Sequence, residues 1–214
     1  MIEALTGRNY ADVIHERVIE PAGVPPLLGA VAGKAYTVRS IGERPTDEAD
    51  LAATFGRADL IPDTTIGPDA LLALNDARAQ VAGIPGGGAI ASAADIAAVY
   101  QQFLRNDHPT LPAAWLADAV GTIRNGSLNV SDKVPANRTI AGYVAGNDGF
   151  HLHRGMPAAP HAFGHHGAGG QLCWVDPDSG ISFCFLNDTL HQDPRVEFRR
   201  AAELNELVLD LLQS

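Results

Sequence analysis

The densest group of chemistry-bearing side chains is a set of five histidines within residues 151–166: His151, His153, His161, His165 and His166. Neutral imidazoles are common zinc ligands, so the group raises the question of a metal site. Its spacing matches neither a cysteine–histidine pattern nor His-Glu-x-x-His, and the segment is rich in turn residues. We therefore expect no metal or organic cofactor, and a histidine-rich metal-binding module remains an alternative.

The candidates for a serine nucleophile and a phosphate loop all favour structural roles. Ser92 lacks the Gly-x-Ser-x-Gly elbow and stands where a hydroxyl cap begins a helix. Ser127-Leu128-Asn129 has a Ser-x-Asn shape, but its glycine- and turn-rich surroundings indicate a surface turn. Residues 86–88 are glycines without the Gly-Lys-Ser/Thr ending of a phosphate loop.

Three segments, in matching order, resemble the class C β-lactamase-like serine hydrolases, a family that includes β-lactamases, esterases and D-amino-acid peptidases. Residues 6–24 are similar to the helix and Pro-Leu-Gly turn that follow the family's Tyr-x-Asn motif. Residues 85–95 resemble its glycine-rich approach to a capped helix. Residues 163–190, which begin Phe163-Gly-His-His-Gly-Ala-Gly-Gly-Gln171, look like its terminal sheet. The resemblance implies the C-terminal portion of such a hydrolase.

The resemblance also assigns roles to three residues of the third segment. In the family this motif is Lys-Thr-Gly or His-x-Gly on a strand beside the nucleophile. His165 matches its hydrogen-bonding head, and Gly167 the position where the substrate backbone approaches. Ala168 would present its backbone N–H to the oxyanion of an acyl transfer, where a fixed donor stabilises the developing charge. These three are the predicted catalytic residues.

The side chains that perform the attack in that family are absent from the sequence. Its two lysines, Lys34 and Lys133, are preceded three residues earlier by Val31 and Val130, so no Ser-x-x-Lys exists. None of its four tyrosines is followed two positions later by asparagine. We therefore expect the nucleophile segment to lie outside this chain, upstream of Met1. The alternative from another class is a non-catalytic binding or partner subunit.

Composition excludes several other classes of function. The net charge of −10 and the lack of a lysine- or arginine-rich run argue against nucleic acid as a partner. No apolar run is long enough to span a membrane, and no secretory signal is visible. The expectation is a cytoplasmic protein as written, with the compartment open if an upstream segment exists. The resemblance implies a small ester, amide or lactam as the substrate.

The resemblance implies a partial serine β-lactamase/transpeptidase-like fold of the α+β class, in which an antiparallel sheet with a C-terminal helix packs on a helical region. Residues 1–214 would form one partial domain, with a mainly helical region at 1–120 and terminal strands with the C-terminal helix at 140–214. Residues 27–68 are predicted to form long surface connections, with one short strand near residues 35–41. The predicted helices occupy residues 10–19, 68–83, 93–104, 113–120 and 194–212.

Residues 171–186 predict a hairpin around the turn Asp176–Gly180. Both of its faces are apolar, so helices should cover both sides of the sheet. Counting outward from the turn pairs Cys173 with Cys184 across the two strands, and we expect both thiols to be reduced. If the first strands of the family's sheet are missing, an unpaired edge remains, and such edges favour self-association.

Overall fold

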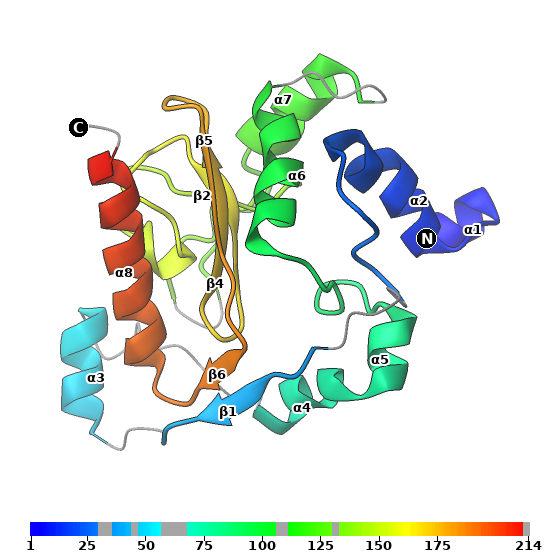
Figure 1. Cartoon of the computed structure of the whole chain (residues 1–214). Helices are drawn as coiled ribbons and strands as arrows, with labels where there is room; N and C mark the ends of the chain where they lie inside the picture. Colours follow the sequence, from blue (N-terminus) through cyan, green and yellow to red (C-terminus); the bar gives the residue numbers. More distant parts are fainter. Residues whose placement is uncertain (30–35, 44–46, 57–67, 106–110, 130–132, 212–214) are drawn as a thin grey trace.

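The computed structural model describes residues 1–29, 36–43, 47–56, 68–105, 111–129 and 133–211 (Figure 1). Its centre is a four-stranded sheet in the order β2–β3–β4–β5, in which all neighbours are antiparallel. The α+β class, with an antiparallel sheet and a C-terminal helix, is therefore confirmed. The four strands are β2 (Tyr143–Val144), β3 (Phe163–Gly167), β4 (Gln171–Asp176) and β5 (Ile181–Phe185).

The β4–β5 hairpin has the predicted register. Asp176 pairs with Ile181, and Cys173 lies directly opposite Cys184. The Asp176 carboxylate accepts hydrogen bonds from the backbone N–H groups of the turn, and Gly180 takes a positive φ of 77°. This local chemistry fixes the turn and therefore the register, since shifting the pairing by one residue would turn every side chain to the other face.

Helix α8 (Pro194–Leu211) covers one face of the sheet, and helix α6 (Ala93–Arg105) covers the other (Figure 1). On the α8 side, the fully buried Trp174 donates its indole N–H to Oδ1 of Asn205 at 2.8 Å. On the α6 side, Tyr100 lies against Phe163, with ring centroids 6.5 Å apart. Both apolar faces are thus removed from water, as the hairpin pattern predicts.

Both helices begin at side-chain caps that the sequence indicates. Oγ of Ser92 accepts from the N–H of Asp95 at 3.2 Å, and the Asp95 carboxylate accepts from the N–H of Ser92 at 2.9 Å, which is a reciprocal capping box. Asp193 accepts from the N–H of Arg195 at 3.0 Å at the start of α8. Ser92 therefore has the structural role expected of it.

The N-terminal segments pack on α6. Helix α1 (Ile2–Thr6) ends at Gly7, which adopts the left-handed conformation expected past a helix end. Buried apolar side chains around Ile19 contact Val99 and its neighbours on α6. The other helical elements near α6 in the chain are α2 (Tyr10–Ile14), η1 (His15–Ile19) and η2 (Glu20–Ala22) before it and α7 (Ala113–Gly121) after it.

Residues 47–56 correct the prediction of surface connections throughout residues 27–68. They contain helix α3 (Glu48–Phe55), whose cap Asp47 accepts from two backbone N–H groups at 3.0 and 3.1 Å. Leu51 and Phe55 are buried, and the Phe55 ring lies 4.8 Å from Phe198 of α8. Two apolar residues four positions apart suffice for one buried helical face, but they are too few for a clear periodic signal.

The predicted strand near residues 35–41 is partly confirmed as β1 (Arg39–Ile41), while residue 35 lies outside the described residues. It pairs in parallel with β6 (Thr189–His191), a strand that the pattern did not indicate. The helix predicted at 68–83 is divided into α4 (Pro68–Leu72), η4 (Ala73–Asn75) and α5 (Ala77–Ala82). Asp76 causes the division, because its extended backbone starts a new capped helix.

No helix in the described part of the chain combines the length and apolar character needed to cross a bilayer.

The Trp174–Asn205 hydrogen bond should make a large contribution to stability. Asn205→Ala would leave the buried indole N–H without its acceptor, a loss that costs about 1–3 kcal/mol. Glu206→Ala, on the exposed side of the same helix, is the matched control and should change the free energy of unfolding by less than about 0.5 kcal/mol. Urea unfolding of both variants measures the difference. Equal stabilities would contradict this view of the α8 contact.

Candidate active site

The predicted site residues lie at the end of β3, where the chain turns into β4. Gly167 is the last residue of β3 and pairs with Gln171. Between them Gly169 and Gly170 take φ values of 84° and 75°, which are left-handed conformations that favour glycine. A Cβ atom at Gly169 would lie 2.5 Å from the carbonyl oxygen of Thr189. The turn therefore depends on glycine for both its conformation and its close packing.

The side chain of Asn187 holds this turn in place. Its Nδ2 donates to the carbonyl oxygen of Gly169 at 2.8 Å. The Asn187 peptide in turn binds the carboxamide of Gln171, donating to Oε1 at 2.8 Å and accepting from Nε2 at 2.9 Å. Gln171 thus extends the pairing of β4 past the end of β5 with its own side chain. The Gly167–Gln171 turn and the chain after β5 are consequently one hydrogen-bonded unit.

Two side chains of helix α8 contact the same turn. Nη2 of Arg200 donates to the Gly169 carbonyl oxygen at 2.9 Å, and the guanidinium lies 5.3 Å from the centre of the Phe185 ring. Glu197, one helical turn earlier, lies under Gly170, where an added Cβ would come within 3.3 Å of its side chain. Burial raises the pKa of the Glu197 carboxyl to about 7, against the lowering effect of Arg200.

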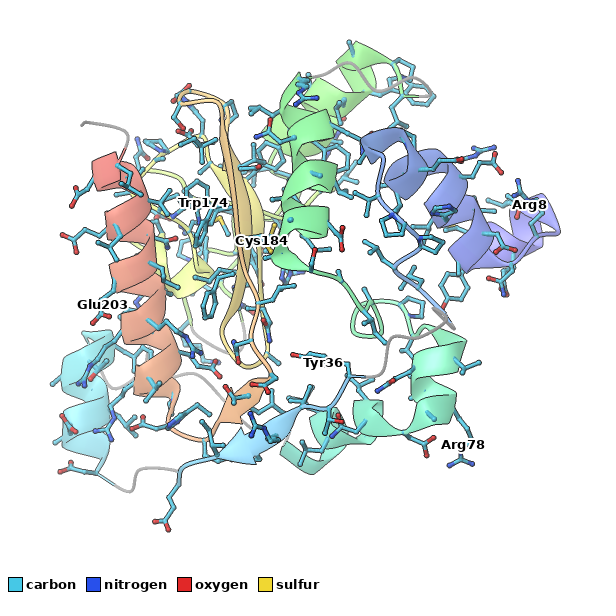
Figure 2. The ribbon with its side chains drawn as sticks, in the orientation of Figure 1. Arg8, Tyr36, Arg78, Trp174, Cys184 and Glu203 are labelled. Atoms are coloured by element: carbon cyan, nitrogen blue, oxygen red, sulfur yellow. The ribbon has the colours of Figure 1, made fainter. Side chains whose placement is uncertain are left out.

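A cavity of about 500 Å³ opens beside the turn and is walled by Gly167, Ala168 and Gln171 on the sheet side. Its opposite wall comes from α4, α5 and the glycine segment 86–88. Tyr36, which precedes β1, also lines the cavity, and its hydroxyl donates to the Asn187 carbonyl oxygen at 2.5 Å (Figure 2). Two of the three predicted site residues thus share one cavity.

His165 lies on the same strand but is not among the described residues that line this cavity. Its ring is in contact with Tyr143 of β2, with centroids 4.8 Å apart, and Arg138 lies over the same tyrosine ring. Its surroundings lower the imidazole pKa by desolvation, and Arg138 lowers it further, although the hydrogen bond to His166 raises it. That bond joins Nδ1 to the His166 carbonyl, which can only accept. A neutral ring therefore presents Nε2 as an acceptor.

The other side of β3 is anchored by the buried Arg154. Its guanidinium donates to the carbonyl oxygens of Pro135 at 2.9 Å and Ala145 at 2.6 Å, and it forms an ion pair with Asp148. The Arg154 carbonyl in turn accepts from Nδ1 of His166 at 3.1 Å. A buried guanidinium needs this full set of partners because an unpaired charge in the core is costly.

The five histidines have separate local roles. His161 pairs with Asp178 at 2.8 Å, which raises its pKa, and His153 packs among aromatic rings that include Phe198. Among the described residues, which include all five, no three His, Cys, Asp or Glu side chains are grouped as a metal ion would require. The geometry gives no support to a histidine-rich metal module.

The segment Ser127-Leu128-Asn129 lies in an exposed antiparallel turn, as predicted. The Ser127 N–H donates to the Asn125 side chain at 2.9 Å, and the Asn129 N–H donates to the Val134 carbonyl at 2.8 Å. Neither residue is among those described as lining the cavity. The sequence does not predict Asn187 or Tyr36 as site residues, because neither segment contains a local pattern that would place them side by side at the turn.

The family model described as Beta-lactamase matches residues 1–206, and the chain belongs to this family. A comparison with curated proteins found no match.

Two solved structures show the same fold. One is a penicillin-binding protein homolog from Caulobacter crescentus, with a TM-score of 0.59 and 18% identity over 95% of this chain and 54% of that one. The other is EstA from Arthrobacter nitroguajacolicus Rue61a, with a TM-score of 0.61 and 18% identity over 98% of this chain and 56% of that one. The chain therefore spans a little over half the length of either.

The glycine turn can be tested with two matched substitutions. Gly169→Ala would place a methyl group 2.5 Å from the Thr189 carbonyl oxygen, whereas Gly180→Ala, also at positive φ, meets no atom within 4 Å. Gly180→Ala should cost about 1–2 kcal/mol for its backbone conformation alone. Gly169→Ala should cost about 1–3 kcal/mol more, because crowding is added. Denaturant unfolding of both variants measures this, and a larger cost at Gly180 would contradict the described packing.

Glu197 should make stability depend on pH near neutrality. Its carboxyl pKa rises from 4.5 to about 7 on folding, so the neutral form is favoured in the folded state. This contribution to the free energy of unfolding is fully present below pH 4.5 and is lost as pH rises through 7. The loss amounts to at most about 3 kcal/mol, because each pKa unit corresponds to about 1.4 kcal/mol.

Glu197→Gln should remove this part of the pH dependence, because glutamine stays neutral throughout. Glu203→Gln, at an exposed position on the same helix (Figure 2), makes the same change of charge and is the control. Urea unfolding between about pH 4.5 and 8 measures both slopes. A wild-type slope that persists in Glu197→Gln would show that another group is responsible.

Proposed function

We propose that this chain forms the strand-side wall of an acyl-transfer site for a small ester, amide or lactam, and that the nucleophile comes from a segment outside these 214 residues. The observation that carries the proposal is the position of Gly167 and Ala168, at the end of β3 and on the wall of a cavity of about 500 Å³. A cavity of this size suits a small organic substrate.

The proposed contribution to catalysis is electrostatic. The Ala168 N–H would donate to the oxyanion that develops when the acyl carbonyl is attacked. Such a donor is effective when it is fixed before the reaction, and the hydrogen bonds from Asn187 and Arg200 to Gly169 supply that rigidity one residue away. His165, with Nε2 as an acceptor, would hold or receive a proton at the other end of the motif.

The cavity lining favours an uncharged substrate. Its polar side chains are the carboxamides of Asn75, Gln80, Gln171 and Asn187 and the hydroxyl of Tyr36, and among the described lining residues Asp188 alone carries a charge. The Asp188 carboxylate is already paired with Arg39 at 2.8 Å. Amide and peptide groups can orient an ester or amide carbonyl through hydrogen bonds, but they offer no cation to bind a substrate carboxylate.

The open edge of β5 is the proposed place of association with the missing segment. In the described sheet β5 has a neighbour on one side only. The residues that follow it, Leu186, Asn187 and Asp188, line the cavity, so a strand added there would bring its own residues next to Ala168. A second copy of this chain could occupy the same edge, which is the basis for the expected self-association.

The alternative function is a binding subunit that keeps the wall of the pocket and performs no catalysis. The observation that favours it is the absence of Ser-x-x-Lys and Tyr-x-Asn from the sequence. An experiment can separate the two functions by supplying a serine nucleophile. Only the catalytic function predicts that this serine is then acylated.

The test is labelling by a fluorophosphonate, a covalent probe for activated serine. The isolated chain should gain no mass, because it contains no activated serine. Co-expression with a family-derived segment carrying Ser-x-x-Lys and Tyr-x-Asn should give labelling of that serine. Ala168→Pro, which removes the N–H, should slow labelling of the assembled protein by about 10²–10³-fold, the usual effect of losing one oxyanion donor.

Ala168→Gly retains the N–H and is the matched control, which should label at close to the wild-type rate. Circular dichroism verifies that both variants are folded. Labelling of Ser92 or Ser127 in the isolated chain would overturn the absence of a nucleophile. An assembled protein that is never labelled would favour the binding subunit, and equal rates for the two Ala168 variants would remove its N–H from the mechanism.

A further inference from the structure

Cys173 and Cys184 form a dithiol across the two strands of the β4–β5 hairpin. They are directly opposed in the antiparallel register, and both are free thiols. Opposed residues in antiparallel strands have Cα atoms about 4.5 or 5.5 Å apart, depending on the type of pair. Both values fall within the range of about 4.4–6.8 Å found for disulfides. The strand register is therefore compatible with the spacing that a disulfide requires.

The two thiols differ in access to solvent. Cys173 is buried on a strand with neighbours on both sides, whereas Cys184 is half-buried on β5, at the edge of the described sheet. Cys184 lies on the side of the sheet that faces α6, opposite the side that holds Trp174 (Figure 2). A small reagent would reach Cys184 first, and Cys173 would then be its nearest thiol.

The contact between the sulfurs favours the same order of reaction. The interaction with the neighbouring Cys173 thiol lowers the pKa of Cys184. The same contact, together with burial, raises the pKa of Cys173. The thiolate is the reactive form of cysteine, so Cys184 is suited to attack and Cys173 to resolve the product.

We propose that Cys173 and Cys184 are a redox-modification site that forms a reversible cross-strand disulfide by exchange with a small disulfide such as oxidised glutathione. The Cys184 thiolate attacks one sulfur of the reagent, forming a mixed disulfide and releasing one glutathione thiolate. Cys173 loses its proton to solvent and attacks the Cys184 sulfur, releasing the second glutathione. The protein dithiol is oxidised, and one glutathione disulfide is reduced to two thiols.

The bridge would lock β4 to β5, the edge strand of the described sheet, on the face covered by Tyr100. Because β5 leads directly into the segment that holds the cavity wall, the modification would restrict opening of this end of the sheet. This inference does not depend on the proposed catalytic function. It requires only the strand register and access to Cys184.

The test is intact-mass analysis of the folded chain after incubation with oxidised glutathione and quenching with an alkylating agent. The wild type should lose about 2 Da, the mass of two hydrogens, and become resistant to alkylation. Digestion without reductant should give one peptide pair linking Cys173 to Cys184, and dithiothreitol should restore both thiols. The bridged protein should also unfold at a higher temperature than the reduced protein.

Two serine variants define the order of reaction. Cys173→Ser should retain one glutathionyl group on Cys184, because the resolving thiol is absent. Cys184→Ser should remain largely unmodified while folded. A stable glutathione adduct on the folded wild type would overturn the proposal, as would disulfide-linked dimers in place of the internal bridge. Bridge formation only after urea unfolding would also overturn it.

Discussion

The structure depends on burying both faces of the β4–β5 hairpin. A strand pair that is apolar on both sides cannot remain at the surface, so it must lie between two layers. Helix α8 provides one layer and is held in register by the buried Trp174–Asn205 hydrogen bond. Helix α6 provides the other, with Tyr100 over the cysteine pair. This arrangement fixes the direction of β3, and therefore the place where its last residues meet the cavity.

The site itself is made rigid by polar contacts between segments that are distant in sequence. Asn187, after β5, and Arg200, on α8, both donate to the Gly169 carbonyl oxygen of the turn. The side chain of Gln171, the first residue of β4, in turn binds the Asn187 backbone. On the other side of β3, the Arg154 guanidinium binds the carbonyl oxygens of Pro135 and Ala145 and the carboxylate of Asp148. The backbone carbonyl of Arg154 accepts a hydrogen bond from His166. A backbone donor stabilises an oxyanion only when it is held in place, so the role proposed for the Ala168 N–H depends on these contacts.

Local chemistry explains what could be predicted from the sequence. The Asp176–Gly180 turn sets the pairing of Cys173 with Cys184, and Ser92 with Asp95 sets the start of α6. The pattern did not predict helix α3 or the pairing of β1 with β6, because both depend on partners about 140–150 residues away.

In the candidate site, too, the residues defined by local sequence could be predicted, and those defined by contacts between distant segments could not. The motif identified Gly167 and Ala168, whose role depends on the local backbone. His165 is the third predicted site residue, and its ring lies against Tyr143 of β2 and near Arg138. Asn187 and Tyr36 could not be found from the sequence, because a lone asparagine after a strand and a lone tyrosine before one carry no local signal. Their importance comes from a tertiary contact between them.

Binding of an oxyanion at the end of β3 can be measured by NMR titration of the ¹⁵N-labelled chain with a small boronic acid, whose tetrahedral anion resembles the intermediate of acyl transfer. The amide resonances of Ala168 and its neighbours in the turn should shift most, together with those of Asn187. Amides near His153 and His161 should remain unchanged. Shifts centred on the histidine-rich segment, or none at the turn up to saturating concentrations, would contradict a role for the end of β3 in binding an oxyanion.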